Sequence, residues 1–186
     1  MKDKMPEAEV SLRLAAWLIS EGHVEGEVQI AIDGAQVKTL DVVHFPIARF
    51  LKKIGATPLE LTEAWTGRYA YGPCTLSIVS KSGVGDVVAK MVGGGRLRVE
   101  SKKGTLTRSN SSSEYPLIRE ALGQLLTTEH VEPGDVMAVA VPHSDKFQEL
   151  AARWRSAPLV AKAGLKILTV STDGSVHGLP QIAPQS

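Results

Sequence analysis

The chain has 186 residues, of which 43 % are hydrophobic and 22 % are charged. These values are ordinary for a globular domain, and they exclude a disordered, a collagen-like and a membrane-embedded chain. Lysine and arginine number 21 against 20 acidic residues, so the net charge of +1 gives no global attraction for nucleic acid. A single cysteine, Cys74, excludes an internal disulfide framework. Because the sequence also shows no apolar leader or membrane span, we expect a cytoplasmic protein without a membrane partner.

The first 72 residues contain two clear patterns and one ambiguous stretch. Apolar residues recur with helical spacing over residues 8–20, which predicts an amphipathic helix. Two alternating runs, 28–32 and 37–43, flank Asp33-Gly34 and predict a β-hairpin, because this dipeptide favours tight hairpin turns. Residues 47–54 form a predicted short helix after Pro46, ended by Gly55. Residues 56–72 are predicted as loop, with a strand near 68–71.

The remainder of the chain alternates more regularly. Strands at 76–79, 86–92 and 96–102 are predicted to form a meander, followed by a helix at 114–127, a buried strand at 136–141, a helix at 145–154 and a strand at 166–170. This order predicts an α/β fold with a mixed central β-sheet flanked by helices, to which an N-terminal helix and β-hairpin are added. We divide the chain into residues 1–72, which pack on the core or aid substrate binding, a core at 73–178, and a flexible tail at 179–186.

The predicted hairpin of residues 86–102 gathers charged side chains on one face. If Gly93 to Gly95 form its loop, paired residue numbers sum to 188, so that Lys102 faces Asp86 and Glu100 faces Val88. Side chains alternate between the two faces of a strand. One face then carries Asp86, Val88, Lys90, Arg98, Glu100 and Lys102, and the other carries Val87, Ala89, Met91, Leu97 and Val99. The second face is the predicted core, and the first is the candidate site.

Two carboxylates and a lysine on one face suit metal-assisted phosphodiester hydrolysis. Mg²⁺ takes oxygen ligands and keeps several waters for substrate and nucleophile. We expect Asp86 and Glu100 to bind the ion and the Ser101 carbonyl to supply a further oxygen. Lys102 would steer the attacking water or neutralise negative charge on the phosphoryl group.

These residues resemble a known motif. Gly85-Asp86, a spacer ending in glycines, and Arg98-Val99-Glu100-Ser101-Lys102-Lys103-Gly104 resemble the PD-(D/E)xK nuclease superfamily, with glycine where the motif's name has proline. The resemblance spans residues 75–178 and implies a restriction-endonuclease-like core. It also implies Mg²⁺ bound by the acidic residues, with Mn²⁺ able to substitute, and a lysine that assists the water.

The resemblance implies two further site residues. Several branches of the superfamily carry a glutamine on the helix after the motif, and Gln124 is the candidate for that role. Many branches also add a glutamate from a helix ahead of the sheet, for which Glu9 is the nearest candidate and Glu7 and Glu60 are rivals.

The implied function is a Mg²⁺-dependent endonuclease acting on DNA, in restriction or phage defence. Its predicted phosphate contacts are Lys90, Arg98, Lys103 and Arg108. Two alternatives stay open: a non-catalytic nucleic-acid-binding or interaction module of the same fold, and an RNA nuclease. A homodimer is a further hypothesis, because a double-strand cutter with one site per chain commonly pairs its sites across a two-fold axis. A glutamate and a lysine two residues apart on a strand also commonly form a salt-bridged solvent face, so the prediction depends on the combination of features.

Overall fold

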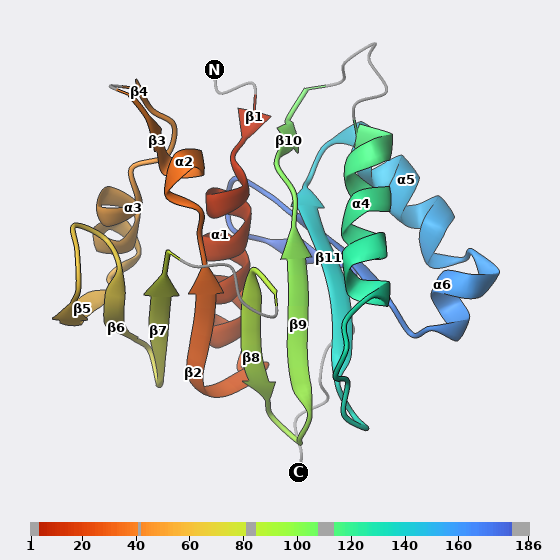
Figure 1. Ribbon diagram of the computed structural model, residues 1–186, viewed down its shortest axis with the longest axis horizontal. Helices are drawn as coiled ribbons and strands as arrows, with labels where there is room; N and C mark the ends of the chain where they lie inside the picture. Colours follow the sequence, from red (N-terminus) through yellow and green to blue (C-terminus); the bar gives the residue numbers. More distant parts are fainter. Residues whose placement is uncertain (1–3, 41, 81–84, 108–113, 180–186) are drawn as a thin grey trace.

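The structure is a computed structural model, and it describes residues 4–40, 42–80, 85–107 and 114–179. Within these residues nine strands form one mixed sheet (Figure 1). In sheet order they are β13 (Val176–His177), β12 (Lys166–Val170), β11 (Val136–Pro142), β9 (Arg96–Ser101), β8 (Val87–Met91), β2 (Val24–Ala31), β7 (Cys74–Val79), β6 (Gly67–Tyr71) and β5 (Thr57–Leu61). The pairs β9/β11, β11/β12 and β2/β7 are parallel, and the other neighbours are antiparallel. The prediction of a mixed central sheet flanked by helices is therefore confirmed.

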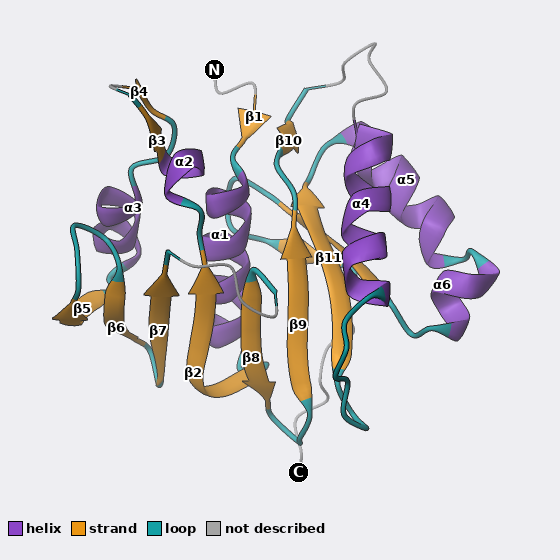
Figure 2. Ribbon diagram, in the orientation of Figure 1, coloured by secondary structure: helices purple, strands orange, loops and turns teal. Residues whose placement is uncertain are grey.

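Helices cover both faces of this sheet (Figure 2). On one face lies α1 (Glu7–Ser20), with α3 (Ile47–Ile54) packed beside it through Phe50, whose ring lies 5.3 Å from the Arg13 guanidinium. On the other face lie α4 (Glu114–Leu126) and α5 (Asp145–Arg155), followed by α6 (Pro158–Lys162). Two hydrophobic cores result, because alternate residues of β11 point to opposite faces. Ala138 packs in the α1 core and Val139 in the core under α4 and α5.

Four short strands and one helical turn complete the described elements. The strands β1 (Lys4–Met5) and β10 (Gly104–Thr105) pair with each other, which ties the start of α1 to the segment that follows β9. The strands β3 (Lys38–Thr39) and β4 (Val42–Val43) form a second small pair after the turn α2 (Gly34–Val37).

The predicted helices at 8–20, 47–54, 114–127 and 145–154 are confirmed to within about a residue, as are the strands at 136–141 and 166–170. Each helix has a clear start or end signal. Glu7 and Glu9 lie in the first turn of α1, where negative charge offsets the helix dipole. Gly55 ends α3 in the left-handed conformation, with a φ of 83°.

The predicted hairpin of residues 28–32 and 37–43 is wrong. The strand β2 instead pairs with β7 on one edge and β8 on the other, and Gly34 begins the helical turn α2. Both edges of β2 are therefore occupied, and no edge is left for residues 37–43. Val28 and Ile30 are completely buried in the centre of the sheet, so tertiary packing overrides the local turn signal.

Two further corrections concern β7 and β5. The predicted meander is right for β8 and β9, but β2 lies between β7 and β8, so those two strands are not neighbours. The edge strand β5 was predicted as loop. All its residues are exposed, and Pro58 within such a short run argues against a strand unless the strand lies at the edge of a sheet.

The division of the chain at residue 72 stays a prediction, although β2 belongs to the same sheet as the later strands. The proposed tail begins at Leu179, which packs against the α1 core, and residues 180–186 lie outside the described ranges. None of the helices in the described part of the chain is both long and apolar enough to cross a membrane.

Candidate active site

The hairpin of β8 and β9 has a different register from the predicted one. Val87 pairs with Val99 and Lys90 with Arg96, so the paired residue numbers sum to 186 rather than 188. The Met91 N–H donates to the Gly95 carbonyl at 3.1 Å, so the pairing continues to Met91 and Gly95 and the loop is residues 92–94 rather than 93–95. Asp86 directly precedes β8 and is hydrogen-bonded to Val99 and Ser101, on either side of Glu100, rather than facing Lys102.

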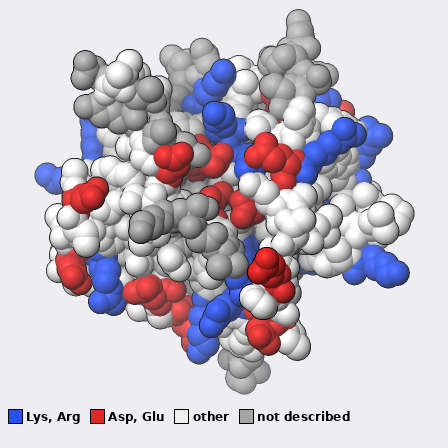
Figure 3. Space-filling view, in the orientation of Figure 1, with Lys and Arg blue, Asp and Glu red and all other residues white. Residues whose placement is uncertain are grey.

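A shift of two residues leaves the side-chain faces unchanged, because faces alternate with a period of two. Val87, Ala89, Leu97 and Val99 are indeed buried in the α1 core. Glu100 pairs with Val139 of β11, so it lies on the opposite face, together with α4. Acidic side chains gather over the upper ends of β8 and β9 on this face (Figure 3).

The backbone of two strands, β2 and β9, holds Asp86 in place. Its N–H donates to the Val99 carbonyl at 2.8 Å, and its carbonyl accepts from the Ala31 N–H at 2.9 Å. Its side-chain Oδ2 accepts a hydrogen bond from the Ser101 N–H at 2.7 Å. This last contact joins the carboxylate directly to the end of β9.

The surroundings of Asp86 oppose its negative charge. Burial is the main cause that raises its pKa to about 7, and the charges of Glu100 and Glu7 add to the effect. The Ser101 N–H and the Lys102 ammonium act in the other direction but are outweighed. A cation bound near Asp86 would stabilise its ionised carboxylate and lower its pKa.

Glu100 and Ser101 end β9. Burial raises the pKa of Glu100, and the charges of Glu7 and Glu120 contribute, while Lys102 opposes them. Ser101 is fully buried, and its Oγ has no hydrogen-bond partner among the described residues. The role of the Ser101 carbonyl as a metal ligand stays a prediction.

Lys102 is 7 % exposed and lies beside α4. Its N–H donates to the Ala140 carbonyl at 2.8 Å, and its Nζ donates to Glu120 Oε1 at 3.0 Å. Burial opposes the ammonium charge, but this hydrogen bond and the charges of Glu7, Glu120 and Asp86 outweigh it and raise the pKa of Lys102. Lys102 is therefore a cation at neutral pH.

Glu120 is a site residue that the sequence reasoning missed. It lies four residues before Gln124, one turn earlier on the same side of α4. Gln124 is exposed, and its predicted role stays a prediction. The helical spacing from Gln124 was the available signal for Glu120.

The three candidates for an additional acid lie in different surroundings. Glu9 is buried and bonded to Arg13, with Oε1 at 2.8 Å from Nη2 and 3.0 Å from Nε. Glu7, one of the two rivals, affects the pKa of Asp86, Glu100 and Lys102. Glu60 lies on β5, four strands from β8 and so about 19 Å across the sheet. Electrostatics thus favour Glu7 over Glu9 and Glu60.

The predicted phosphate contacts also differ from one another. Lys90 is exposed and forms an ion pair with Glu25 of β2. Arg98 is buried, and its Nε contacts Asp135 Oδ2 at 3.3 Å. Lys103 is exposed. Arg108 lies outside the described residues.

Acidic groups predominate among the interacting charges of the site. Glu7 and Glu120 affect the pKa values of both Glu100 and Lys102, and Glu7, Glu100 and Lys102 affect that of Asp86. No group of three or more histidine, cysteine, aspartate or glutamate side chains in the described ranges is arranged to hold a metal. The predicted ligand set is smaller than such a group, since it combines two carboxylates with a backbone carbonyl, and Mg²⁺ commonly keeps waters in its remaining positions.

Comparisons of the chain with family models, with curated proteins and with solved structures found no match.

Proposed function

We propose that the protein is a Mg²⁺-dependent endonuclease that hydrolyses phosphodiester bonds in DNA, with Asp86, Glu100 and Lys102 at its centre. The observation that supports this proposal is a pair of electrostatically interacting, partly buried carboxylates, Asp86 directly before β8 and Glu100 on β9, near a buried lysine. Burial is the largest cause of both raised pKa values, so the ionised carboxylates are poorly stabilised by their surroundings. A divalent ion would stabilise them.

Each residue would have a separate task. Asp86 and Glu100 would hold Mg²⁺, with the Ser101 carbonyl as a third oxygen, and the bound ion would polarise a phosphoryl oxygen as a Lewis acid. Lys102, whose pKa is raised, keeps its proton at neutral pH. It would therefore neutralise developing negative charge on the phosphoryl group rather than accept a proton.

The choice of DNA and the setting of restriction or phage defence rest on the motif resemblance. The same carboxylates and lysine would serve an RNA nuclease equally well, because the scissile group is a phosphodiester in both cases. Competition between matched DNA and RNA substrates separates these two activities.

The test is cleavage of supercoiled plasmid with Mg²⁺, Mn²⁺ or EDTA, using the wild-type protein and the variants Glu100→Gln and Lys102→Ala. We expect nicking that requires metal and falls at least about a hundredfold in both variants. Glu149→Gln and Lys146→Ala are matched controls, because they remove the same charges from an ion pair on α5 with an N–O distance of 3.0 Å. These controls should cleave like the wild type.

Circular dichroism of each variant establishes that it is folded. If the folded wild-type protein cleaves neither plasmid, single-stranded DNA, branched DNA nor RNA, the nuclease proposal fails. Binding without cleavage would then favour the non-catalytic module.

A further inference from the structure

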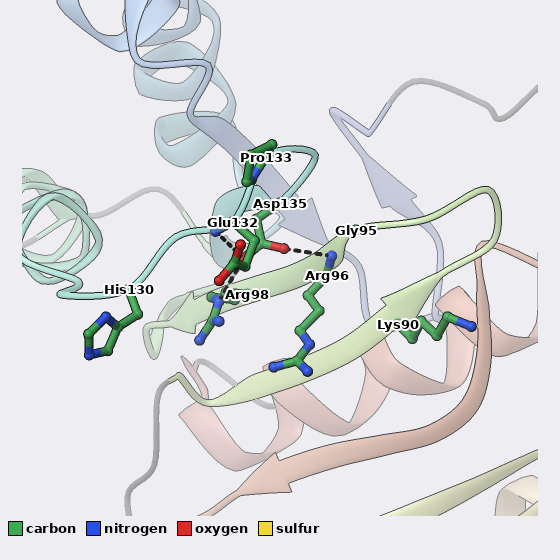
Figure 4. Close-up of a pocket in the computed structure, with 8 residues that line it drawn as sticks. All are labelled: Lys90, Gly95, Arg96, Arg98, His130, Glu132, Pro133 and Asp135. Carbon is green, nitrogen blue, oxygen red and sulfur yellow. Dashed lines mark hydrogen bonds and ion pairs between the residues drawn. The ribbon is translucent and has the colours of Figure 1, made fainter.

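A hollow of about 470 Å³ lies at the hairpin-loop end of β8 and β9, against the segment that leads into β11 (Figure 4). It is on the same face of the sheet as the candidate active site. Its polar lining consists of Lys90, Arg96, Arg98, His130, Glu132 and Asp135. Only Lys90 and Arg98 among these are predicted phosphate contacts.

Asp135 fixes the floor of this hollow. Its carboxylate accepts hydrogen bonds from the Arg96 N–H at 2.9 Å, the Glu132 N–H at 3.2 Å and Arg98 Nε at 3.3 Å. The β8–β9 loop also lies against the segment before β11. A Cβ added at Gly95 would lie only 2.1 Å from the Gly134 carbonyl oxygen. Asp135 thus joins the start of β9 to the segment that leads into β11.

The positive charges of the hollow are unequally neutralised. Lys90 and Arg96 are directly paired across the hairpin, an arrangement of like charges that is destabilising by itself. Glu25 neutralises Lys90, and Asp135 neutralises Arg98. The exposed Arg96 guanidinium has no ion pair with any residue that the structure describes, while the Glu132 carboxylate is the remaining acid in the lining.

We propose that this hollow binds a phosphate of a nucleic-acid backbone, with Arg96 as the principal contact and Lys90 and His130 at its rim. The inference rests on the proposed function and identifies how the substrate would be held away from the scissile bond. Arg96 and Glu100 lie on the same face of β9, four residues and so about 13 Å apart. That distance equals roughly four base-pair steps of about 3.4 Å each. The contacted phosphate therefore belongs to the flank of the substrate.

The test measures binding without cleavage. Fluorescence anisotropy of a labelled DNA duplex in EDTA, over a series of salt concentrations, gives Kd and its salt dependence. We expect Arg96→Gln to weaken binding roughly tenfold at low salt and to reduce the slope of log Kd against log salt by about 1. Arg49→Gln is the matched control, because Arg49 is an exposed arginine on α3, beside α1 on the other face of the sheet.

Lys90→Gln provides a second variant, which should also reduce the salt slope. Unchanged Kd and salt slope in folded Arg96→Gln and Lys90→Gln would overturn the inference about the hollow. Metal-dependent cleavage by the wild type would still support the nuclease proposal in that case. A wild-type protein that binds no duplex would overturn it as well.

Calorimetry with inorganic phosphate separates two sources of the same anion. If Arg96→Gln weakens binding of inorganic phosphate and leaves duplex binding unchanged, the hollow takes a free anion and the backbone assignment is wrong. If duplex binding depends on Arg96 while no DNA is cleaved, the inference stands and the proposed function fails.

Discussion

At the scale of single residues, Asp86 links the candidate site to the stability of the fold. Burial raises its pKa from 3.8 to about 7, so the folded protein holds a proton that the unfolded chain releases. The stabilising contribution of protonated Asp86 is therefore complete below about pH 4 and is lost as the pH rises through 7.

We therefore predict that Asp86→Asn removes this loss of stability in metal-free protein. Between pH 4 and pH 8 the free energy of unfolding of the wild type should fall relative to that of the variant by roughly 2 to 4 kcal/mol, since one pKa unit corresponds to about 1.4 kcal/mol. Urea unfolding in EDTA at several pH values measures the difference. Glu149→Gln, which removes an exposed carboxylate, should keep the pH dependence of the wild type. Parallel pH curves for Asp86→Asn and the wild type would contradict the prediction.

Glu120 offers a second prediction, concerning the position of the Lys102 ammonium. Glu120→Gln keeps the size of the side chain but removes the charge that Lys102 contacts at 3.0 Å. If the nuclease proposal holds, single-turnover cleavage should slow about five- to tenfold, less than in Lys102→Ala, with KM unchanged. Because Glu120 is 59 % exposed, its ion pair should add at most about 1 kcal/mol to stability.

Glu149→Gln is again the control for Glu120→Gln, and Glu120→Asp should recover part of the rate. An unchanged cleavage rate in Glu120→Gln would show that Glu120 does not position Lys102. A fall in stability that accounts for the whole loss of rate would show a purely structural role.

At the scale of elements, the position of β10 depends on close packing against α5. A Cβ on Gly104 would lie 2.2 Å from Phe147 Cε2, and the Phe147 ring is completely buried. Gly104→Ala should therefore lower the free energy of unfolding by about 1 to 3 kcal/mol. Gly123→Ala on α4 should raise it by up to about 1 kcal/mol, because a Cβ there meets no atom within 4 Å and alanine favours the helix. Chemical denaturation of both variants tests the pair, and equal effects would contradict the packing argument.

The same elements show which features a sequence can predict. The helices α1, α4 and α5 were predicted because each carries its own apolar stripe, which is a local property. The pairing of β2 is not local, since its partners β7 and β8 lie more than 40 residues later. Asp33-Gly34 indicated a turn, but nothing near it indicated that β2 would be enclosed.

At position 85 this chain has glycine where the motif's name has proline. Gly85 has a φ of 142°, which the proline ring cannot adopt because it fixes φ near −65°. The glycine that departs from the motif's name thus matches the backbone that precedes Asp86. The faces of the hairpin were predictable from strand alternation, whereas its register depended on whether the loop is residues 92–94 or 93–95.

At the scale of the whole molecule, the candidate site combines segments far apart in the chain. Pairing of β1 with β10 brings the start of α1 to the end of β9, so Glu7 influences residues about 90 positions later. Such a contact has no sequence signal of its own. This is why sequence reasoning, which proposed Asp86, Glu100 and Lys102 from one hairpin, placed Glu9 ahead of Glu7.

The negative charge of the candidate site predicts that Mg²⁺ stabilises the whole fold. Mg²⁺ that binds only the folded protein should stabilise it by about 2.7 kcal/mol at a hundred times its Kd. For a protein of this size that corresponds to a rise in Tm of roughly 5 to 10 °C. The rise should be larger at pH 8 than at pH 6, because the proton on Asp86, whose pKa is about 7, competes with the ion. Differential scanning calorimetry at constant ionic strength, with NaCl replacing MgCl₂ in the control, measures it. Glu100→Gln should lose most of the rise, and an equal rise in that variant would place the ion elsewhere.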